Sequence, residues 1–290
     1  MTPVVERITA WTAAAVLALG VPTALAAQDS TPYKNHLYDK FQGTLDFTTV
    51  INSSNARVDG NGGQGTTLDF KSVLGVPGTT VQPALGFKWK PGRHTELDLG
   101  YQFINQSGQR TFTDTVVIGS DTLSGNVDLS SKLGSNNATV QVKYSIWAAE
   151  RHSIGLAVGF GAIFFRADFT GSASGCVATS CDSTGAFSIS KSVTVPTASL
   201  GAFGRWRLGD RWYVGGDARG LGGRVDRYDI SVFEGDAAAQ YFLSNTWGLA
   251  LGWYYTNVTV NISPRLDASG FSGKVAYDYS SLRLGAVYAF

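Results

Sequence analysis

The feature that most restricts the fold of this chain is an alternation of apolar and polar residues with a period of two. One alternating segment runs from Val81 to Trp89, and after a turn at Pro91 the alternation restarts at Thr95. Successive side chains of a β-strand point to opposite faces, so each segment is predicted to be a strand with one apolar and one polar face. The short turn between the two segments predicts an antiparallel hairpin.

Ten segments follow this plan along the chain. They are 41–52, 81–89, 95–103, 140–146, 154–164, 200–208, 212–218, 237–243, 247–255 and a final run that ends at Phe290. Charged residues make up only 16% of the chain, against roughly 25% in soluble domains, so much of the surface is expected to face something other than water. We therefore predict an all-β fold, a transmembrane antiparallel up-and-down β-barrel over 41–290 with about ten strands, eight being the alternative.

The N-terminus has the features of an export signal. Arg7 precedes an apolar run over 8–21, and small residues follow at Ala24 and Ala26. The alternative is a membrane anchor, but the apolar run is shorter than the roughly 18 to 20 residues that a spanning helix needs. We predict a signal peptide over 1–26 and a periplasmic segment over 27–40. No later segment is apolar enough to cross a bilayer as a helix, so a membrane-embedded chain must form a closed barrel.

Connection lengths predict the orientation of the barrel. Four connections have two or three residues, whereas those near 53–78, 105–137 and 170–192 reach twenty or more. Outer-membrane barrels have short periplasmic turns and long extracellular loops, so both termini are expected in the periplasm. Tryptophans beside the short turns predict an aromatic girdle at the lipid interface. These girdle residues are Trp89, Trp147, Trp206, Trp212 and Trp247.

The last ten residues, 281–290, carry a family resemblance. Their apolar residues alternate, with Tyr288 two positions from the end and Phe290 as the terminal residue. This run is similar to the C-terminal signal of bacterial outer-membrane proteins, and the chain resembles the small outer-membrane β-barrel families that include the OmpA membrane domain and OmpW. The resemblance implies a bacterial outer-membrane location, contact with outer-membrane lipid, and recognition of Tyr288 and Phe290 by the barrel assembly machinery. The named relatives have eight strands, so their roles are not carried over to this chain.

The C-terminal strand shows a change of phase. Tyr277 and Tyr279 occupy odd positions, whereas Leu282 and Leu284 occupy even ones. One unbroken pleat would point one of these sets inward, so we predict a bulge near residues 280–281. The alternative is that the upper part of the strand projects beyond the bilayer, where either face is allowed.

Enzymatic chemistry is not expected. The barrel enzymes that this layout resembles use a histidine, and the chain has three histidines. His94 and His152 fall in predicted periplasmic turns and His36 precedes the first strand, so none reaches an extracellular rim. Neither a cofactor nor a metal site is predicted. The near balance of 23 basic and 22 acidic residues argues against nucleic-acid binding.

Two cysteines, Cys176 and Cys181, lie in a segment rich in Gly, Ser and Thr. In an exported chain a local disulfide is the natural interpretation, and a metal site without neighbouring histidines is the weaker one.

Charged residues at inward positions suggest the state of the lumen. The basic ones are Lys88, Lys143, Arg205, Arg207, Arg219 and Arg283, and the acidic ones are Asp46, Glu96, Asp98, Asp217, Glu234 and Asp236. Equal numbers of opposite charges in a narrow lumen are expected to pair and fill it. We therefore predict a structural or binding barrel with a charge-filled lumen and long extracellular loops for an unidentified partner. The alternative is a narrow, porin-like passive pore for ions or small solutes.

Overall fold

The computed structural model describes residues 33–52, 55–59, 67–69, 71, 75–112, 116–118, 121–123, 126–177, 180–225, 228–263 and 272–290. All but the first of these residues belong to one compact unit, Lys34–Phe290. The predicted signal peptide lies outside the described residues, as does most of the segment 27–40.

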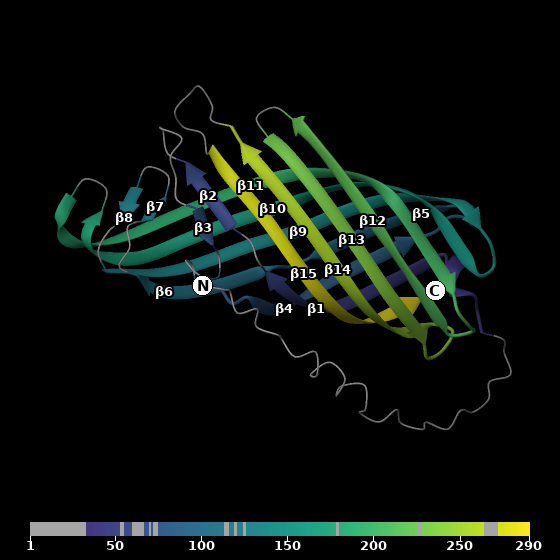
Figure 1. The fold of residues 1–290 in the computed structure, drawn as a ribbon. Helices are drawn as coiled ribbons and strands as arrows, with labels where there is room; N and C mark the ends of the chain where they lie inside the picture. The colour runs from purple at the N-terminus through teal and green to yellow at the C-terminus, as the bar shows by residue number, and fades with distance from the viewer. Residues whose placement is uncertain are drawn as a thin grey trace, which may run out of the picture. The chain divides into compact units, whose positions relative to one another are not determined.

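The described residues form one short 3-10 helix and a set of antiparallel strands (Figure 1). In chain order they are η1 (His36–Tyr38), β1 (Phe41–Asn52), β2 (Asn55–Asp59), β3 (Thr67–Asp69), β4 (Thr79–Trp89), β5 (Thr95–Gln102), β6 (Asn105–Phe112), β7 (Val116–Ile118), β8 (Asp121–Leu123), β9 (Asn126–Ala148), β10 (His152–Val177), β11 (Ser180–Arg207), β12 (Trp212–Val225), β13 (Tyr228–Phe242), β14 (Trp247–Ile262) and β15 (Ser272–Ala289). No helix within these ranges is long and apolar enough to cross a membrane.

Ten of these strands close into a ring. The order is β1, β4, β5, β9, β10, β11, β12, β13, β14 and β15, and β15 pairs back with β1. Backbone hydrogen bonds between Phe41 and Phe290, at 3.2 and 3.0 Å, secure the closing seam. The prediction of an antiparallel barrel with ten strands is confirmed.

The outer face of the ring carries the apolar half of each alternating pattern. On β10, Phe160 is 61% exposed, whereas the inward neighbour Ala157 is 1% exposed. Exposed apolar side chains occur on strands all round the ring, including Leu45, Phe47, Leu85, Leu99, Val140, Val142, Leu156, Leu200, Leu249, Leu251, Leu282 and Leu284. Water would disfavour so large an apolar surface, whereas lipid accommodates it, so this belt is the membrane-facing wall of a transmembrane barrel.

The belt has the height of a membrane core. Outward apolar positions on β10 begin at Ile154 and end at Phe164, and the next outward residue is Arg166. About ten residues at a rise of about 3.4 Å and a tilt of about 40° cover roughly 26 Å. This matches the apolar band of such barrels, and β10 continues beyond it to Val177.

The short connections lie together at one end of the ring. They join Trp89 to Thr95, Ala148 to His152, Arg207 to Trp212, and Phe242 to Trp247. The paired ends of β1 and β15 lie at the same end, as predicted. The five predicted girdle tryptophans are all exposed and all stand within two residues of these turns.

The prediction of long loops near 105–137 and 170–192 is wrong, because the structure has strands there. Residues 170–192 continue β10 and β11 as a hairpin, with Gly171 opposite Phe187, and 105–137 contains β6, β7, β8 and most of the upper half of β9. The apolar alternation does not reveal these strands because their outward side chains above Phe164 are polar, so the apolar set that faces lipid is missing there. Of the third expected loop, 53–78, only parts are described, including β2 and β3.

The predicted bulge near residues 280–281 is also wrong. The β14–β15 register is unbroken from the pair Trp247 and Tyr288 to the pair Ile262 and Gly273. Tyr279 points inward, is 1% exposed, and donates a hydrogen bond to Gln102 Oε1 at 2.7 Å. The unbroken ladder favours the alternative, a strand whose upper part projects beyond the bilayer, and the inward Tyr279 packs among apolar side chains in the upper part of the lumen.

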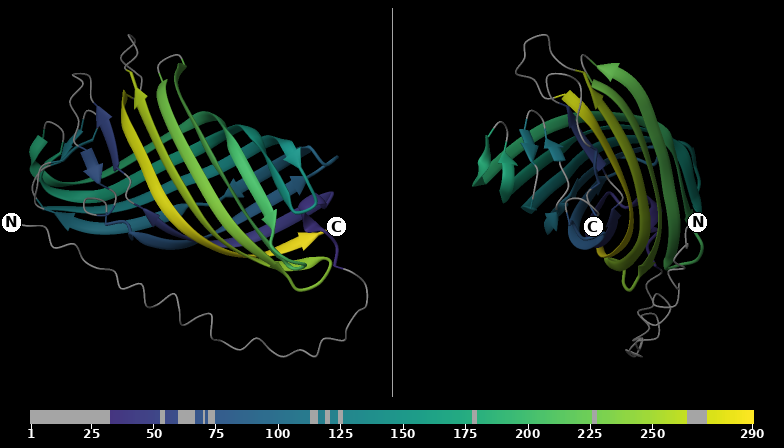
Figure 2. Two further views of the ribbon diagram at one scale, coloured as in Figure 1. Left: turned by 45° about the vertical axis from the view of Figure 1, so that its right-hand side comes forward. Right: turned by 60° about the vertical axis from the view of Figure 1, so that its left-hand side comes forward.

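The wall divides above its middle. The β11–β12 register ends at the pair Leu200 and Gly220, whereas β11 continues upward beside β10 alone. Figure 2 shows β12–β15 diverging from the longer β9–β11. The upper part of β11 thus has a neighbour on one side only.

Candidate functional site

The candidate site is the lumen, which is filled in three layers. The N-terminal plug, residues 34–39, occupies the mouth beside the short turns. The charge layer consists of paired acidic and basic side chains from the middle of the strands. The apolar layer lies toward the opposite end of the ring.

The N-terminal plug is anchored through His36. The imidazole stacks on the Phe242 ring with centroids 3.5 Å apart, and its Nδ1 lies 2.7 Å from Asp39 Oδ2. The His36 backbone N–H donates to the Tyr213 hydroxyl at 3.1 Å. His36, Leu37 and Asp39 are all buried, so the plug is packed within the mouth of the barrel.

Hydrogen bonds at the rim hold the plug from two sides. The Tyr38 hydroxyl donates to the Ala149 carbonyl at 2.6 Å, and the Asn35 side-chain amide donates to the Glu150 carbonyl at 2.8 Å. On the other side, the Lys34 backbone N–H donates to Asn245 Oδ1 at 3.0 Å. The plug therefore bridges the β9–β10 and β13–β14 turns across the mouth.

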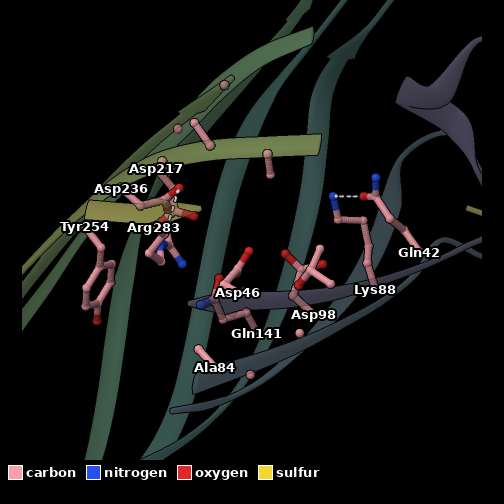
Figure 3. Close-up of a pocket in the computed structure, with 18 of the residues that line it drawn as sticks. Gln42, Asp46, Ala84, Lys88, Asp98, Gln141, Asp217, Asp236, Tyr254 and Arg283 are labelled. Carbon is pink, nitrogen blue, oxygen red and sulfur yellow. Dashed lines mark hydrogen bonds and ion pairs between the residues drawn. The ribbon is translucent and has the colours of Figure 1, made fainter. Parts of the chain in front are cut away.

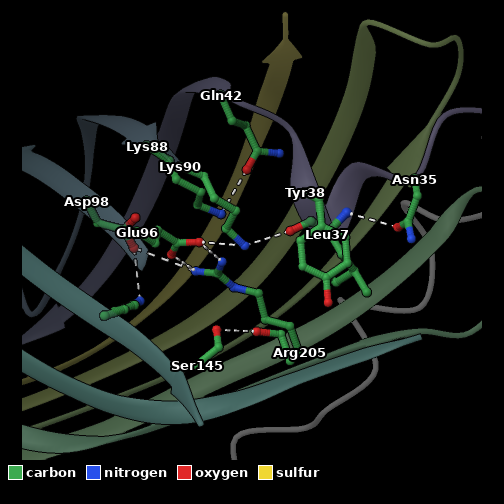
Figure 4. Close-up of polar contacts among 12 residues, drawn as sticks. Asn35, Leu37, Tyr38, Gln42, Lys88, Lys90, Glu96, Asp98, Ser145 and Arg205 are labelled. Atoms are coloured by element: carbon green, nitrogen blue, oxygen red, sulfur yellow. Dashed lines mark hydrogen bonds and ion pairs between the residues drawn. The ribbon is translucent and has the colours of Figure 1, made fainter. Parts of the chain in front are cut away.

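The first part of the charge layer surrounds Glu96 (Figure 4). The carboxylate of Glu96 accepts hydrogen bonds from Nη1 and Nη2 of Arg205 and lies 3.1 Å from Lys90 Nζ. Lys90 also donates to the Leu37 carbonyl at 2.6 Å, so this cluster is tied to the N-terminal plug. Asp98 lies 3.6 Å from the same arginine, which extends the cluster along β5.

The second part is centred on Asp217. Lys143 Nζ lies 2.9 Å from Asp217 Oδ2, and it also lies 3.0 Å from Asp98, which joins the two clusters. Arg219 Nε is 2.9 Å from Asp217 Oδ1 as an ion pair without hydrogen-bond alignment. Arg219 Nη2 continues to Glu234 Oε2 at 3.2 Å.

The outer end of this second cluster is more open. Arg283 Nη2 lies 3.7 Å from Asp236, and the Arg283 guanidinium lies over the Tyr254 ring at 5.2 Å. The Tyr254 hydroxyl donates to Glu234 Oε1 at 2.8 Å. Asp217 and Asp236 stand directly opposite each other across β12 and β13, which places two carboxyl groups side by side.

One predicted lumen residue lies elsewhere. Arg207 Nη2 pairs with Asp210 at 2.9 Å and its Nε donates to the Gly209 carbonyl, so Arg207 belongs to the β11–β12 turn. Lys90, which is not among the predicted lumen residues, is 4% exposed inside the mouth. Lys88 donates to Gln42 Oε1 at 2.9 Å. Asp46 and Lys88 line the cavity described below, and the structure places the other predicted lumen charges in the two clusters described above.

A cavity of about 280 Å³ remains between the layers (Figure 3). Its lining includes Asp46 and most of the charge layer. Several buried polar side-chain atoms of lining residues lack a hydrogen-bond partner within the described structure, among them Gln42 Nε2, Asp98 Oδ1 and Gln141 Oε1. Buried polar groups of this kind need a hydrogen-bond partner, so the cavity is suited to ordered water or a small polar solute.

Glycines on the inner wall make room for the charge layer. A Cβ on Gly201 would lie 2.6 Å from Arg219 Cγ, and one on Gly159 would lie 2.6 Å from Ser199 Oγ. Gly159 belongs to the Gly-rich stretch of β10, which therefore provides space inside the barrel.

The apolar layer was missed by sequence reasoning. It consists of Val50, Ile104, Ile163, Val195, Ile230, Val232, Val258, Val260, Ile262 and Tyr279. These residues point into the lumen at the same alternate positions as the charged residues below them. The upper half of the lumen is therefore apolar, whereas the sequence analysis expected charged residues at inward positions. The signal available was the β-branched run at alternate positions of 258–262.

The remaining predicted residues lie away from the lumen. Tyr288 and Phe290 are exposed on the outer face beside the closing seam. Cys176 and Cys181 belong to the β10–β11 hairpin tip, where Gly175 faces Ser183, but their side chains lie outside the described residues and the disulfide stays a prediction.

All three histidines make structural contacts at the end of the ring that carries the short turns. His36 belongs to the N-terminal plug, His94 Nδ1 lies 2.7 Å from the Ser145 carbonyl oxygen, and the His152 ring packs edge-on against Trp147 at 4.7 Å. None of these contacts pairs a histidine with a serine nucleophile.

Comparison with known proteins finds likeness only among solved structures. No family and no curated protein matches the chain. The Pseudomonas putida toluene transporter TodX shares 11% identity over 87% of this chain and 90% of its own, with a TM-score of 0.33. OprG from Pseudomonas aeruginosa shares 12% identity over 87% of this chain and 96% of its own, with a TM-score of 0.34. The outer membrane protein AlkL shares 15% identity over 90% and 92%, with a TM-score of 0.35.

Two of these structures, OprG and AlkL, are outer membrane proteins. The present chain has the closed antiparallel ring, the apolar outer belt and the aromatic residues beside short turns that transmembrane β-barrels require. It is a transmembrane β-barrel.

Proposed function

We propose that this chain is a closed outer-membrane barrel that anchors an extracellular β-sheet, formed by the upper parts of β6, β9, β10 and β11, for binding at the cell surface. The observation that carries the proposal is the filling of the lumen by three successive layers. A passive pore needs a continuous water path, and side chains of each layer packed into the lumen support the proposal that this path is interrupted.

The charge layer supports closure through energetics. The buried charges are matched by partners from several strands, and removing one partner of a buried pair costs about 3 to 5 kcal/mol. Moving these side chains aside to admit an ion would break the same pairs. The barrel is therefore expected to resist opening.

The upper strands support the anchoring role. On β10 the outward residues are apolar up to Phe164 and polar from Arg166 on, and the strand continues to Val177. This sheet projects beyond the membrane while the barrel holds its base. We further propose that the barrel assembly machinery inserts the chain through the C-terminal strand β15, with Phe290 as its recognised end.

A narrow pore for ions or small solutes is the second candidate. The cavity of about 280 Å³ and its unpartnered polar atoms favour it, because they show polar space in the middle of the lumen. In that case the N-terminal plug would be the gate on the periplasmic side.

Planar-bilayer conductance of the refolded protein separates the two candidates. We expect no steady conductance from the wild type, from a double plug variant with His36→Ala and Tyr38→Ala, or from the control His94→Ala, whose histidine lies outside the plug. Gel mobility before and after boiling verifies that each variant is folded. A steady, ion-selective wild-type current, or a current that appears only in the plug variant, would replace the closed barrel with the pore.

A further inference from the structure

On the outer wall formed by β9, β10 and β11, the outward side chains of β10 change from apolar to charged and polar above Phe164. Asn136, Phe164 and Thr194 form one row across these strands, and Phe164 is the last outward apolar residue of β10. In the next row, Arg166 lies between Gly134 and Ser192. In the row beyond, Asp168 lies between Lys132 and Ser190.

A hollow of about 760 Å³ lies over these rows. Its exposed lining residues include Asn105, Lys132, Phe164, Arg166, Ser192 and Thr194. The hollow has two chemically different halves. The lower half is formed by the apolar ring of Phe164, and the upper half carries cationic, hydroxyl and amide groups.

The two cations of the hollow keep donors available. Arg166 is 68% exposed on its side chain, and its Nε binds Asp168 Oδ2 at 2.8 Å, which leaves both terminal nitrogens without a partner in the described structure. Lys132 has no hydrogen bond or ion pair to any described residue. Because Arg166 faces Gly134, two positions from Lys132 on the neighbouring strand, the two side chains start about 7 to 8 Å apart and can reach one anion between them.

We propose that this hollow, the headgroup site, binds the phosphorylated sugar headgroup of an outer-leaflet glycolipid. The occupant follows from charge and height together. Arg166 stands two residues above Phe164, which is about 5 Å beyond the apolar belt and thus at the level of lipid headgroups. Guanidinium and ammonium groups bind phosphate, while Ser192, Thr194 and Asn105 offer hydrogen bonds to sugar hydroxyls.

The lower half of the hollow fits the same occupant. Phe164 and, lower on the same face of β10, Phe160 are exposed where the acyl chains of that lipid would run. A lipid bound here would contact the wall with its chains and the headgroup site with its phosphate. The inference does not depend on whether the lumen conducts.

The test is retention of bisphosphorylated lipid A by barrels released from phosphatidylcholine nanodiscs, counted by native mass spectrometry over a range of lipid A content. We expect Lys132→Ala and Arg166→Ala each to weaken retention about fivefold, and the double variant about 25-fold. Asp168→Asn should strengthen retention, because it removes the carboxylate that competes for Arg166. Lys274→Ala, an exposed lysine on β15, should leave retention unchanged.

Each other outcome overturns the proposal. Equal losses in Lys274→Ala and Lys132→Ala would show diffuse attraction by the whole surface. Displacement of lipid A by millimolar inorganic phosphate would show a site for free phosphate. If an alanine variant fails to fold by gel mobility, Lys132→Gln and Arg166→Gln take its place, and unchanged retention in the folded pair would exclude the headgroup site.

Discussion

Replacing Glu96 by glutamine tests the charge layer most directly. Glu96 is 2% exposed and its carboxylate is shared by Arg205 and Lys90, which are both largely enclosed. Glutamine has the same shape, so packing is retained while the negative charge is lost. The two cations would then face a neutral amide in a confined space, and an unmatched buried charge costs about 3 to 5 kcal/mol. Asp98 stays 3.6 Å from Arg205 and compensates in part, so we expect a loss of about 3 kcal/mol in the free energy of unfolding.

The assay is equilibrium unfolding by guanidinium of the refolded protein in lipid vesicles, followed by tryptophan fluorescence and by gel mobility. Asp210→Asn is the matched control, because Asp210 also pairs with an arginine, Arg207, but its side chain is 81% exposed. An exposed pair contributes only about 0 to 1 kcal/mol, so the control should unfold nearly as the wild type does.

The result that refutes this reasoning is a Glu96→Gln variant as stable as Asp210→Asn. That outcome would mean that water reaches Arg205 and Lys90 freely, which requires an open, hydrated lumen. It would count against the closed barrel as well as against the buried ion pairs.

Three further predictions concern other parts of the chain. Deleting Phe290 should lower the membrane level of the protein far more than one exposed side chain explains, because the terminal aromatic is expected to signal assembly; normal levels would contradict this. The double variant Cys176→Ser and Cys181→Ser should keep its heat-dependent gel shift, since a disulfide closing so short a loop contributes at most roughly 2 to 3 kcal/mol, felt locally; mass spectrometry showing free thiols in the oxidised wild type would exclude the bond. Tyr279→Phe should lose about 1 kcal/mol of unfolding free energy with the hydrogen bond to Gln102, and an unchanged denaturation midpoint would place that hydroxyl in water.

The membrane-spanning part of the fold was predictable from the sequence because lipid imposes a strict rule. Every second residue within the belt must be apolar, so segments such as 81–89 and 154–164 are recognisable by period alone. Four tight turns then fix the neighbours, and the ring closes with the predicted number of strands. The seam between β1 and β15 follows from closure and needs no sequence signal of its own.

The rest of the structure escaped prediction where that rule ends. Beyond the belt, β10 and β11 satisfy their backbone by pairing with each other, and their outward face needs no apolar residue. The N-terminal plug has no period, since its six residues bind through one ring stack and scattered backbone contacts. Lys90 joined the lumen because the plug brings the Leu37 carbonyl to it, a contact that spans two segments distant in sequence.

Two prolines inside strands lie close to the ends of strand pairing, a feature of the wall that apolar alternation does not show. Proline has no N–H to donate, so it is tolerated where a strand lacks a neighbour on one side. Pro83 pairs with β1 on one side and lies just beyond the end of the β4–β5 register at Ala84. Pro196 pairs with β10 and lies beyond the end of the β11–β12 register at Leu200. Both positions therefore locate the level at which the wall stops being a uniform ring. Below the end of the β11–β12 register at Leu200, β11 pairs with both β10 and β12; above it, within the described residues, β11 pairs with β10, and Pro196, which has no N–H to donate, lies in this part of the strand.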